Sequence, residues 1–400
     1  MKPKSILFRD RLGRVFFVEA EIGKTIKQIL DSNNIPLNSV ICRNKGLVVT
    51  EDHIINENDD IKIEMVRFYD LPTILAKRRV VRNSEDCIYK KEIISFNKGD
   101  IERKIYKYKE DEIGDLVEDI FIDFMKLHGL IVEGDRIAVG FSGGKDSLAL
   151  LLLLHRLKKK LPKFELFAIT VAGWEDPTSF DYTKDICEKL NIEQHIVNPK
   201  QIEEIFGLKQ SLFNTLSKID LDKKYGMHTI YFLHQFMRRG IEEKAKVLGI
   251  NKVFLGLNLE DLFSSFLGFF TTGYEILDFP QRKIGDLTFG FPLFPLTKKE
   301  IGLYVNITAK GFSNQGPTTA FDKGPVSRGF YYYISDKLQD LWPGIEHHIL
   351  AGFNKIRAER ERSEQKKCIN CKTTFLLQTK ETNKEKKCDV CKLLKEFNFI

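Results

Sequence analysis

The chain has 400 residues, 42% of them hydrophobic, which exceeds one average domain and supplies a substantial core. Lysine and arginine total 63 against 56 acidic residues, and the net charge of +7 permits an anionic partner without requiring one. No apolar run reaches membrane-spanning length, and charges interrupt the N-terminal apolar run too early for a signal peptide, so we expect a cytoplasmic protein with no membrane association.

The first 70 residues predict a small β-rich domain. Its ββαββ order resembles the β-grasp fold of ThiS, MoaD and other ubiquitin-like sulfur carriers. Those carriers act through a free Gly-Gly carboxyl terminus, whereas here the last strand continues through residues 68–72 into the rest of the chain. The resemblance therefore implies a docking or substrate-orienting module, with a structural appendage as the alternative. The expected strands are 5–8, 15–19, 40–43, 47–50 and 61–65, with a helix over 25–31.

Residues 71–110 have weak periodicity and are rich in Lys, Glu and Asn, which predicts a linker or a small degenerate adaptor. Cys87 is the one cysteine of this segment. Because a single thiolate cannot build a zinc site, we interpret Cys87 as incidental.

From residue 111, strands alternate with helices, which is the pattern of a doubly wound parallel α/β sheet. In such sheets ligands bind at the carboxyl ends of the strands. The expected helices cover 111–128, 178–190, 229–248 and the run from residue 148 to about 160, and the expected strands are 135–140, 165–171, 195–197 and 252–255.

The segment Phe-Ser-Gly-Gly-Lys-Asp-Ser at 141–147 joins a strand to a leucine-rich helix and predicts a phosphate-binding loop. Two adjacent glycines allow a tight turn that brings N–H groups to an anion, while the lysine and two hydroxyls add charge and hydrogen bonds. An ordinary Gly-Gly turn capped by serine is the alternative. The predicted cofactor-binding residues here are Gly140, Ser142, Gly143, Gly144, Lys145, Asp146 and Ser147.

Ser-Gly-Gly-Lys-Asp-Ser differs from the kinase-like loop, in which the lysine follows a longer spacing. It resembles the pyrophosphate loop, or PP-loop, of the N-type ATP pyrophosphatases, which have an adenine nucleotide alpha hydrolase-like fold. Among them the chain resembles the tRNA 2-thiolation enzymes of the TtuA and TtcA type. The resemblance implies that ATP is cleaved between its α and β phosphates, and that Lys145 and Asp146 are catalytic.

Two later segments border the expected nucleotide crevice, one at Thr170 and one beginning at Gly256. The second reads Gly-Leu-Asn-Leu-Glu-Asp and resembles the Gly-His-Asn-x-Asp-Asp segment of the thiolation enzymes, with Leu257 in place of His. The resemblance implies that Asp261 is catalytic or binds Mg²⁺, which would neutralise charge on the departing pyrophosphate. Helix capping is the alternative for Asn258 and Asp261.

Residues 292–304 resemble a Pro-Leu turn and Lys-Glu helix of the same family. Without that resemblance, the pattern predicts a turn and a helix whose Lys299–Glu300 pair is solvated. Arg238 and Arg239 match a basic pair of the thiolation enzymes. This pair could hold phosphate or RNA backbone, or lie on a solvated helix face.

The tail contains two Cys-x-x-Cys pairs, separated by the sixteen residues 372–387. Four thiolates satisfy tetrahedral Zn²⁺ and leave no open position, so the predicted ribbon is structural. A redox-active dithiol or an iron–sulfur site is the alternative. The predicted metal ligands are Cys368, Cys371, Cys388 and Cys391.

The chain has no cysteine between Cys187 and Cys368. Thiolases of this family carry cysteines in that region, which hold a [4Fe–4S] cluster or relay sulfur, so their absence argues against such a cluster here. We interpret Cys187 as a small packing residue. His228 and His234 could be ligands or acid/base groups, but histidines on an aromatic helix more often serve packing.

We therefore expect an ATP-dependent adenylating enzyme that resembles the tRNA 2-thiolation enzymes and activates a nucleobase carbonyl for sulfur insertion. It would use ATP, Mg²⁺ and Zn²⁺, and its partners would be tRNA, a sulfur donor or ubiquitin-like sulfur carrier, and a second subunit in a homodimer or heterodimer. One alternative is a catalytically diverged ATP- or tRNA-binding subunit, and another is a PP-loop ligase or sulfur transferase with a non-tRNA substrate. The expected domains are 1–70 (β-grasp), 71–110 (linker or adaptor), 111–330 (PP-loop), 331–366 (helical extension) and 367–400 (zinc-binding tail).

Overall fold

The computed structural model describes residues 4–9, 15–33, 35–66, 87–97, 100–171, 179–222, 229–272, 278–310, 312, 326–358, 365–376 and 387–400. Within these ranges, none of the helices has both the length and the apolar character needed to cross a bilayer.

The N-terminal domain is a five-stranded mixed sheet in the order β2-β1-β5-β3-β4, with one helix packed on it. β1 is parallel to β5 and antiparallel to β2, which is the central pairing of a β-grasp fold. Thr25 and Gln28 form a capping box that starts the helix. The elements are β1 Lys4–Arg9, β2 Val15–Ala20, α1 Ile26–Ser32, β3 Val40–Asn44, β4 Leu47–Val49 and β5 Ile61–Met65, with a 3₁₀ turn η1 at Leu37–Ser39.

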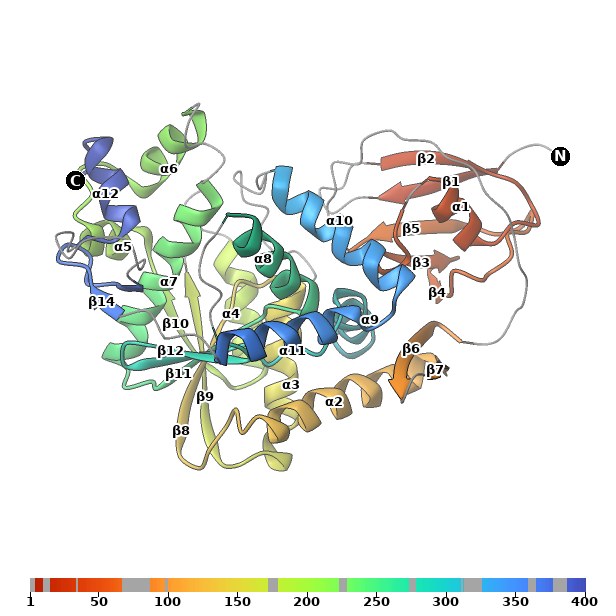
Figure 1. Cartoon of the computed structure of the whole chain (residues 1–400), viewed down its shortest axis with the longest axis horizontal. Helices are drawn as coiled ribbons and strands as arrows, with labels where there is room; N and C mark the ends of the chain where they lie inside the picture. Colours follow the sequence, from red (N-terminus) through yellow and green to blue (C-terminus); the bar gives the residue numbers. More distant parts are fainter. Residues whose placement is uncertain are drawn as a thin grey trace.

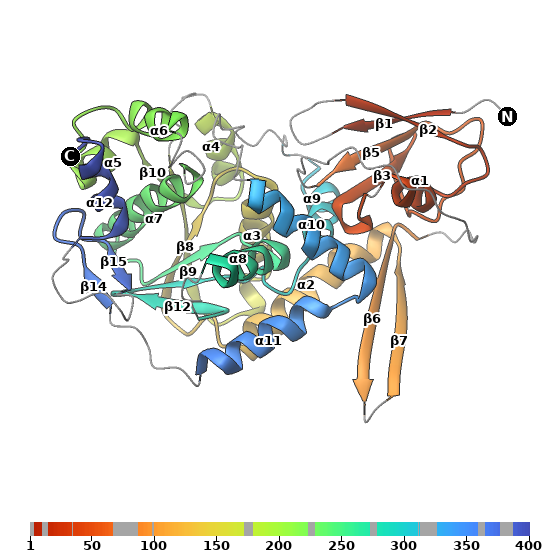
Figure 2. The same ribbon diagram turned by 45° about the horizontal axis from the view of Figure 1, so that its top comes forward.

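A β-hairpin lies within the segment where the sequence predicted a linker or adaptor. Its strands, β6 (Tyr89–Asn97) and β7 (Asp100–Tyr108), pair antiparallel along their full length. Figure 2 shows this hairpin projecting away from the rest of the molecule. Ile93 and Ile105 are exposed on it, so its apolar residues do not mark one buried face, and the alternation typical of a half-buried strand is weak.

The second sheet has six strands in the order β10-β9-β8-β11-β13-β12. All are parallel except β12, which forms an antiparallel edge with β13. The four strands expected from the sequence are present, whereas β12 and β13 were not predicted. The strands are β8 Asp135–Gly140, β9 Phe164–Val171, β10 Glu193–Val197, β11 Lys252–Leu255, β12 Gln281–Ile284 and β13 Leu287–Gly290.

Helices cover both faces of this sheet, so the domain is doubly wound (Figure 1). Ile137 and Val139 of β8 enter one core cluster, which includes α2, α3 and α9, while Ala138 between them enters the other, with α5, α6, α7 and α8. These helices are α2 Glu110–Leu127, α3 Lys145–Arg156, α4 Ser179–Lys189, α5 Pro199–Phe206, α6 Leu212–Leu221, α7 Thr229–Val247, α8 Leu259–Thr272 and α9 Lys298–Thr308.

The β-grasp domain packs directly on the α/β domain. Ile41 and Val66 join the core cluster of α2, α3 and α9, and Gly302 of α9 lies so close that a Cβ there would be 3.1 Å from Ile41 Cδ1. Tyr332 and Tyr333 also pack against the core of the β-grasp domain. They belong to α10 (Val326–Leu341), which lies between the two domains in Figure 1 and precedes α11 (Ile345–Ala358).

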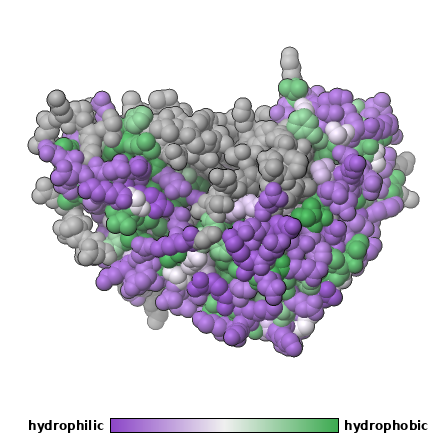
Figure 3. Space-filling model, turned by 180° about the vertical axis from the view of Figure 1, so that it is seen from behind, coloured by the Kyte–Doolittle hydropathy of each residue, from purple (hydrophilic) through white to green (hydrophobic). Residues whose placement is uncertain are grey.

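The C-terminal tail forms a small unit of β14 (Gln365–Lys367), β15 (Thr374–Leu376) and α12 (Asp389–Glu396). Its buried cysteines belong to the same core cluster as α5, α6 and α7. Seen from behind, the described surface is mainly hydrophilic, with apolar residues scattered over it (Figure 3). Scattered apolar side chains are usual on a protein surface and mark no site by themselves.

Candidate active site

The loop predicted to bind phosphate leaves β8 at Gly140 and enters α3 at Lys145. Gly143 has a φ of +77°, and a Cβ there would lie 3.0 Å from Thr183 Cγ2, so both conformation and space require glycine. The Ser147 hydroxyl accepts a hydrogen bond from the Ser142 N–H (3.3 Å) and donates to the Gly144 carbonyl (3.0 Å). No side chain caps the start of α3, so its first N–H groups are available to an anion.

The segment that begins at Gly256 lies against this loop. A Cβ on Gly256 would be 2.9 Å from the Asp146 carbonyl carbon and from the Ser147 nitrogen, which are backbone atoms that cannot move aside. A Cβ on Gly140 would be 2.8 Å from Leu255 Cδ2, the end of a side chain that can shift. Gly256 is therefore the position that lets the end of β11 pack against the loop after β8. The two segments predicted from the sequence lie together at one edge of the sheet.

Both charged side chains of the loop are ion-paired. Lys145 Nζ lies 3.0 Å from Glu64 Oε1 on β5, a residue of the β-grasp domain. Burial raises the Glu64 pKa, but the nearby Lys145 and Arg43 outweigh it, so the pKa is lowered and Glu64 is held as a carboxylate. Asp146 Oδ2 lies 3.0 Å from Lys298 Nζ at the start of α9. Asp146 Oδ1 is buried and has no hydrogen-bond partner among the described residues.

Thr170 lies at the end of β9, beside the strand that leads into the loop. Its hydroxyl accepts a hydrogen bond from Gln194 Nε2 at 2.7 Å, and the same amide donates to Thr183 at 2.9 Å. Because Thr183 also abuts Gly143, this network supports the loop from one side. A direct contact between Thr170 and a nucleotide remains a prediction.

Asn258 and Asp261 cap α8 reciprocally, as the capping alternative predicts. The Asp261 N–H donates to Asn258 Oδ1 at 3.0 Å, and the Asn258 N–H donates to Asp261 Oδ2 at 3.4 Å. The other carboxylate oxygen, Oδ1, accepts a hydrogen bond of 2.5 Å from the Tyr332 hydroxyl of α10. Asp261 is therefore fixed in orientation by two elements, and its metal-binding role remains a prediction.

A model of the PP-loop domain matches residues 109–212, the region that holds the loop and its first helix. The chain contains a PP-loop domain. It is 27% identical over 235 residues to the tRNA 2-thiolation protein NcsA of Haloferax volcanii, and the match covers 54% of this chain and 69% of that protein. It is 32% identical over 162 residues to the tRNA-cytidine(32) 2-sulfurtransferase of Aliivibrio fischeri, covering 40% of this chain and 48% of the relative.

Among solved structures, the chain resembles the U34-tRNA thiolase NcsA from Methanococcus maripaludis, which was solved with its [4Fe–4S] cluster. The TM-score is 0.55 at 20% sequence identity, and the match covers 72% of this chain and 90% of that one. This likeness concerns the fold. Together the comparisons confirm a PP-loop domain that includes residues 109–212, its parallel α/β fold and the similarity to tRNA 2-thiolation proteins. The domain bounds 111–330 remain a prediction.

The prediction of a solvated Lys299–Glu300 pair is wrong. Lys299 is buried, donates to the Leu37 carbonyl at 3.3 Å and forms an ion pair with Glu51 of the β-grasp domain. Glu300 is fully buried and accepts from Lys91 at 2.5 Å and from the Tyr89 hydroxyl at 3.0 Å. Adjacent residues of α9 therefore attach two different segments to the PP-loop domain, the β-grasp domain and the hairpin.

Arg238 and Arg239 have a structural role that neither sequence alternative predicted. Arg239 is buried, and its Nε donates to the Cys371 carbonyl at 2.6 Å. Arg238 Nη2 donates to the Thr373 hydroxyl at 3.0 Å. Both arginines therefore attach the cysteine-rich tail to α7 of the PP-loop domain.

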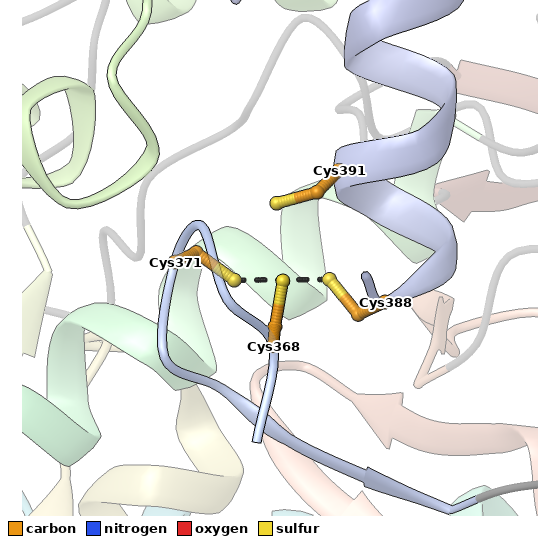
Figure 4. A group of neighbouring side chains, drawn as sticks. All are labelled: Cys368, Cys371, Cys388 and Cys391. Atoms are coloured by element: carbon orange, nitrogen blue, oxygen red, sulfur yellow. Dashed lines mark hydrogen bonds between the residues drawn. The ribbon is translucent and has the colours of Figure 1, made fainter. Parts of the chain in front are cut away.

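The four cysteines of the tail converge (Figure 4). Their Sγ atoms all lie within 4.8 Å of one another, and those of Cys371 and Cys388 are 3.7 Å apart. One tetrahedral ion with Zn–S bonds of about 2.3 Å would place its sulfurs about 3.8 Å apart, so the spacing fits a single ion. Asn370 Nδ2 lies 3.5 Å from Cys391 Sγ and also donates to the Phe206 carbonyl, which orients this corner of the centre.

Sequence reasoning missed Glu64, Lys298 and Tyr332 at the site. Lys298 directly precedes the Lys-Glu motif, so the sequence could have predicted that it begins helix α9. Glu64 and Tyr332 come from elements distant in sequence, and nothing local marks them. His228 lies outside the described residues, and His234 is exposed on α7.

Proposed function

We propose that this chain is an ATP-dependent adenylating enzyme of tRNA 2-thiolation. The observation that carries the proposal is the PP-loop, in which Gly143 is left-handed and the start of α3 has no side-chain cap. This geometry suits the binding of a polyphosphate by backbone N–H groups and Lys145. The relatives supply the substrate class, because two of them are named for 2-thiolation of tRNA.

In the proposed reaction, a nucleobase carbonyl oxygen attacks the α-phosphorus of ATP. The new O–P bond forms as the bond to the β-phosphate oxygen breaks, and pyrophosphate leaves with the electron pair. Lys145 and the loop N–H groups stabilise the charge that develops on the leaving group. Asp146 and Asp261 would hold Mg²⁺, which supplies further charge neutralisation when bound.

In the second step, a sulfur nucleophile attacks the activated carbon, and the C–O bond breaks as AMP leaves. The chain has no cysteine between Cys187 and Cys368 from which to relay sulfur. Cys42 and Cys187 are buried, and burial raises the pKa of both thiols, Cys187 to about 12, so neither forms a ready nucleophile. We therefore propose an external sulfur donor or sulfur carrier as the partner.

We further propose that Cys368, Cys371, Cys388 and Cys391 hold Zn²⁺ rather than an iron–sulfur cluster. The sulfur spacing suits one ion, whereas a four-iron cube placed between the thiolates would need more room. With all four positions filled by protein, the ion would stabilise the tail and take no part in the reaction.

A catalytically diverged subunit is the second candidate function, favoured by the missing central cysteines and by the Lys145–Glu64 pair. The test incubates purified protein with ATP, Mg²⁺ and tRNA and measures AMP, pyrophosphate and 2-thionucleosides, with and without sulfide. The adenylating enzyme forms AMP and pyrophosphate, and Lys145→Ala abolishes this. If the chain binds tRNA but forms no AMP, the diverged subunit replaces the enzyme.

A further inference from the structure

Lys298 is the first residue of α9, and its side chain points to the PP-loop rather than to solvent. Its Nζ lies 3.0 Å from Asp146 Oδ2, and its side chain is only 15% exposed. Asp146 directly follows Lys145 in the first turn of α3. The Lys298 ammonium therefore lies beside the first turn of α3, whose N–H groups we propose bind phosphate.

The backbone of Lys298 is fixed from two directions. Its N–H donates to the buried carboxylate of Glu260 at 2.9 Å, and Thr297 caps the helix that it begins. Glu260 lies between Asn258 and Asp261, in the segment packed against the loop through Gly256. Lys298 therefore has a set position relative to both halves of the candidate nucleotide site, and only its side-chain tip needs to move.

The electrostatics of the loop favour a second cation. A triphosphate carries several negative charges, and Lys145 supplies a single positive charge that Glu64 already partly balances. Lys298 places a second positive charge at the same helix start, in a part-buried place where screening by water is weak, and in this structure Asp146 balances that charge. The long, flexible lysine side chain can exchange a carboxylate for a phosphate oxygen with little backbone movement.

We propose that Lys298 is a second phosphate-binding residue of the PP-loop domain, which contacts the phosphate chain of ATP beside Lys145. This inference rests on the proposed function, because it requires the loop to bind ATP. In the nucleotide complex the Lys298 ammonium donates to phosphate oxygens, and Asp146 is released from its ion pair.

A purely structural role makes a different prediction. If Lys298 only attaches α9 to α3, removing its charge lowers stability and leaves phosphate affinity unchanged. Lys310 is the matched control because it follows the same helix, is 70% exposed and pairs with Glu110 at 3.2 Å.

The experiment titrates the full chain with MgATP and, separately, with inorganic pyrophosphate in a calorimeter. Lys298→Gln should weaken both affinities by about tenfold, which is about 1.4 kcal/mol. Lys298→Arg should recover most of the loss, and Lys310→Gln should match wild type. Lys298→Met, which keeps the aliphatic stem, is measured in parallel so that a folding defect in one variant leaves the other to decide.

Wild-type affinity in Lys298→Gln or Lys298→Met, together with a lower melting temperature, would overturn the inference in favour of the structural role. Wild-type protein that binds both ligands but forms no AMP with tRNA would contradict the proposed function alone, and the Lys298 comparison would still stand. Wild-type protein that binds neither ligand would overturn both.

Discussion

Lys145 of the PP-loop and Glu64 of the β-grasp domain form an ion pair across the domain boundary, with 3.0 Å between Nζ and Oε1. Arg43 contacts the other oxygen of the same carboxylate at 3.7 Å, so Glu64 joins a cation from each domain. A phosphate chain bound in the loop would compete with Glu64 for the same ammonium group. The β-grasp domain therefore forms an ion pair with a residue of the site where we propose that ATP binds.

Removing the Glu64 charge should strengthen nucleotide binding. Glu64→Gln leaves the Lys145 ammonium without its carboxylate, and we expect the Kd for MgATP to fall about two- to fivefold, in line with the energy of a part-exposed ion pair. Calorimetric titration measures the change. Asp60→Asn is the control, since it removes an exposed carboxylate of the same domain that pairs with Lys62. Unchanged or weaker binding in Glu64→Gln would contradict this competition.

Gly256→Ala should strongly weaken nucleotide binding. Its Cβ would lie 2.9 Å from backbone atoms of Asp146 and Ser147, so the first turn of α3 must shift and the anion-binding N–H groups lose their aim. We expect a loss of more than about tenfold in MgATP affinity. Gly352→Ala is the matched control, because a Cβ on that α11 glycine meets nothing within 4 Å. Equal affinities of the two variants would show that the close approach is not needed.

The Glu300 ion pair should make stability depend on pH. Burial raises the Glu300 pKa, but Lys91 and the hydrogen bonds from Thr297 and Tyr89 outweigh it, so the folded pKa lies below the ordinary value. The pair therefore stabilises the fold at neutral pH, and this stabilisation is lost as the pH falls through the folded pKa.

Urea unfolding of wild type and Glu300→Gln tests this linkage. At about pH 7 the variant should be less stable by about 2 kcal/mol, because Lys91 loses a buried partner. The difference should shrink as the pH is lowered below about 4. A difference that stays constant with pH would mean that packing, and not charge, accounts for the effect.

Removal of the metal should unfold the C-terminal tail and leave the structure of the PP-loop unchanged. We expect about one zinc per chain, lost in Cys391→Ser, with a lower melting temperature. Arg239→Ala should retain the metal ligands yet destabilise the tail by about 2 kcal/mol, since it leaves the buried Cys371 carbonyl without its donor. Metal analysis and calorimetric melting measure both effects. Iron and sulfide in place of zinc would contradict the assignment of the metal.

Local patterns predicted the scaffold well, for physical reasons. Alternating apolar residues gave the five strands of the β-grasp domain, and the strand–loop–helix context of Ser142–Ser147 gave the nucleotide loop in its observed place. These elements can be predicted because their pattern lies in residues that are close together in the sequence and form one strand, turn or helix. The same reasoning missed α5, α6, β12 and β13, which are short. The two strands have four residues each, and the two helices, although amphipathic, have only eight and ten.

Pairings between distant residues could not be predicted. Glu64 and Lys145 are 81 positions apart, and Arg239 and Cys371 are 132 apart. A charged pair such as Lys299–Glu300 has the same local pattern whether it meets water or buried carboxylates and amines of another domain. Only the tertiary structure distinguishes these cases. The helix face that was predicted to be solvated is therefore found in an interface.

The start of α9 gives the two N-terminal segments adjacent anchoring points, Lys299 for the β-grasp domain and Glu300 for the hairpin. A chain shortened to begin at α2 would strip both anchors of their counter-charges and free the loop lysine from Glu64 at the same time. Such a truncation would alter the PP-loop domain as well as delete the β-grasp domain and the hairpin. Adding the N-terminal part back as a separate chain would therefore distinguish the contribution of the β-grasp domain from the damage caused by the truncation.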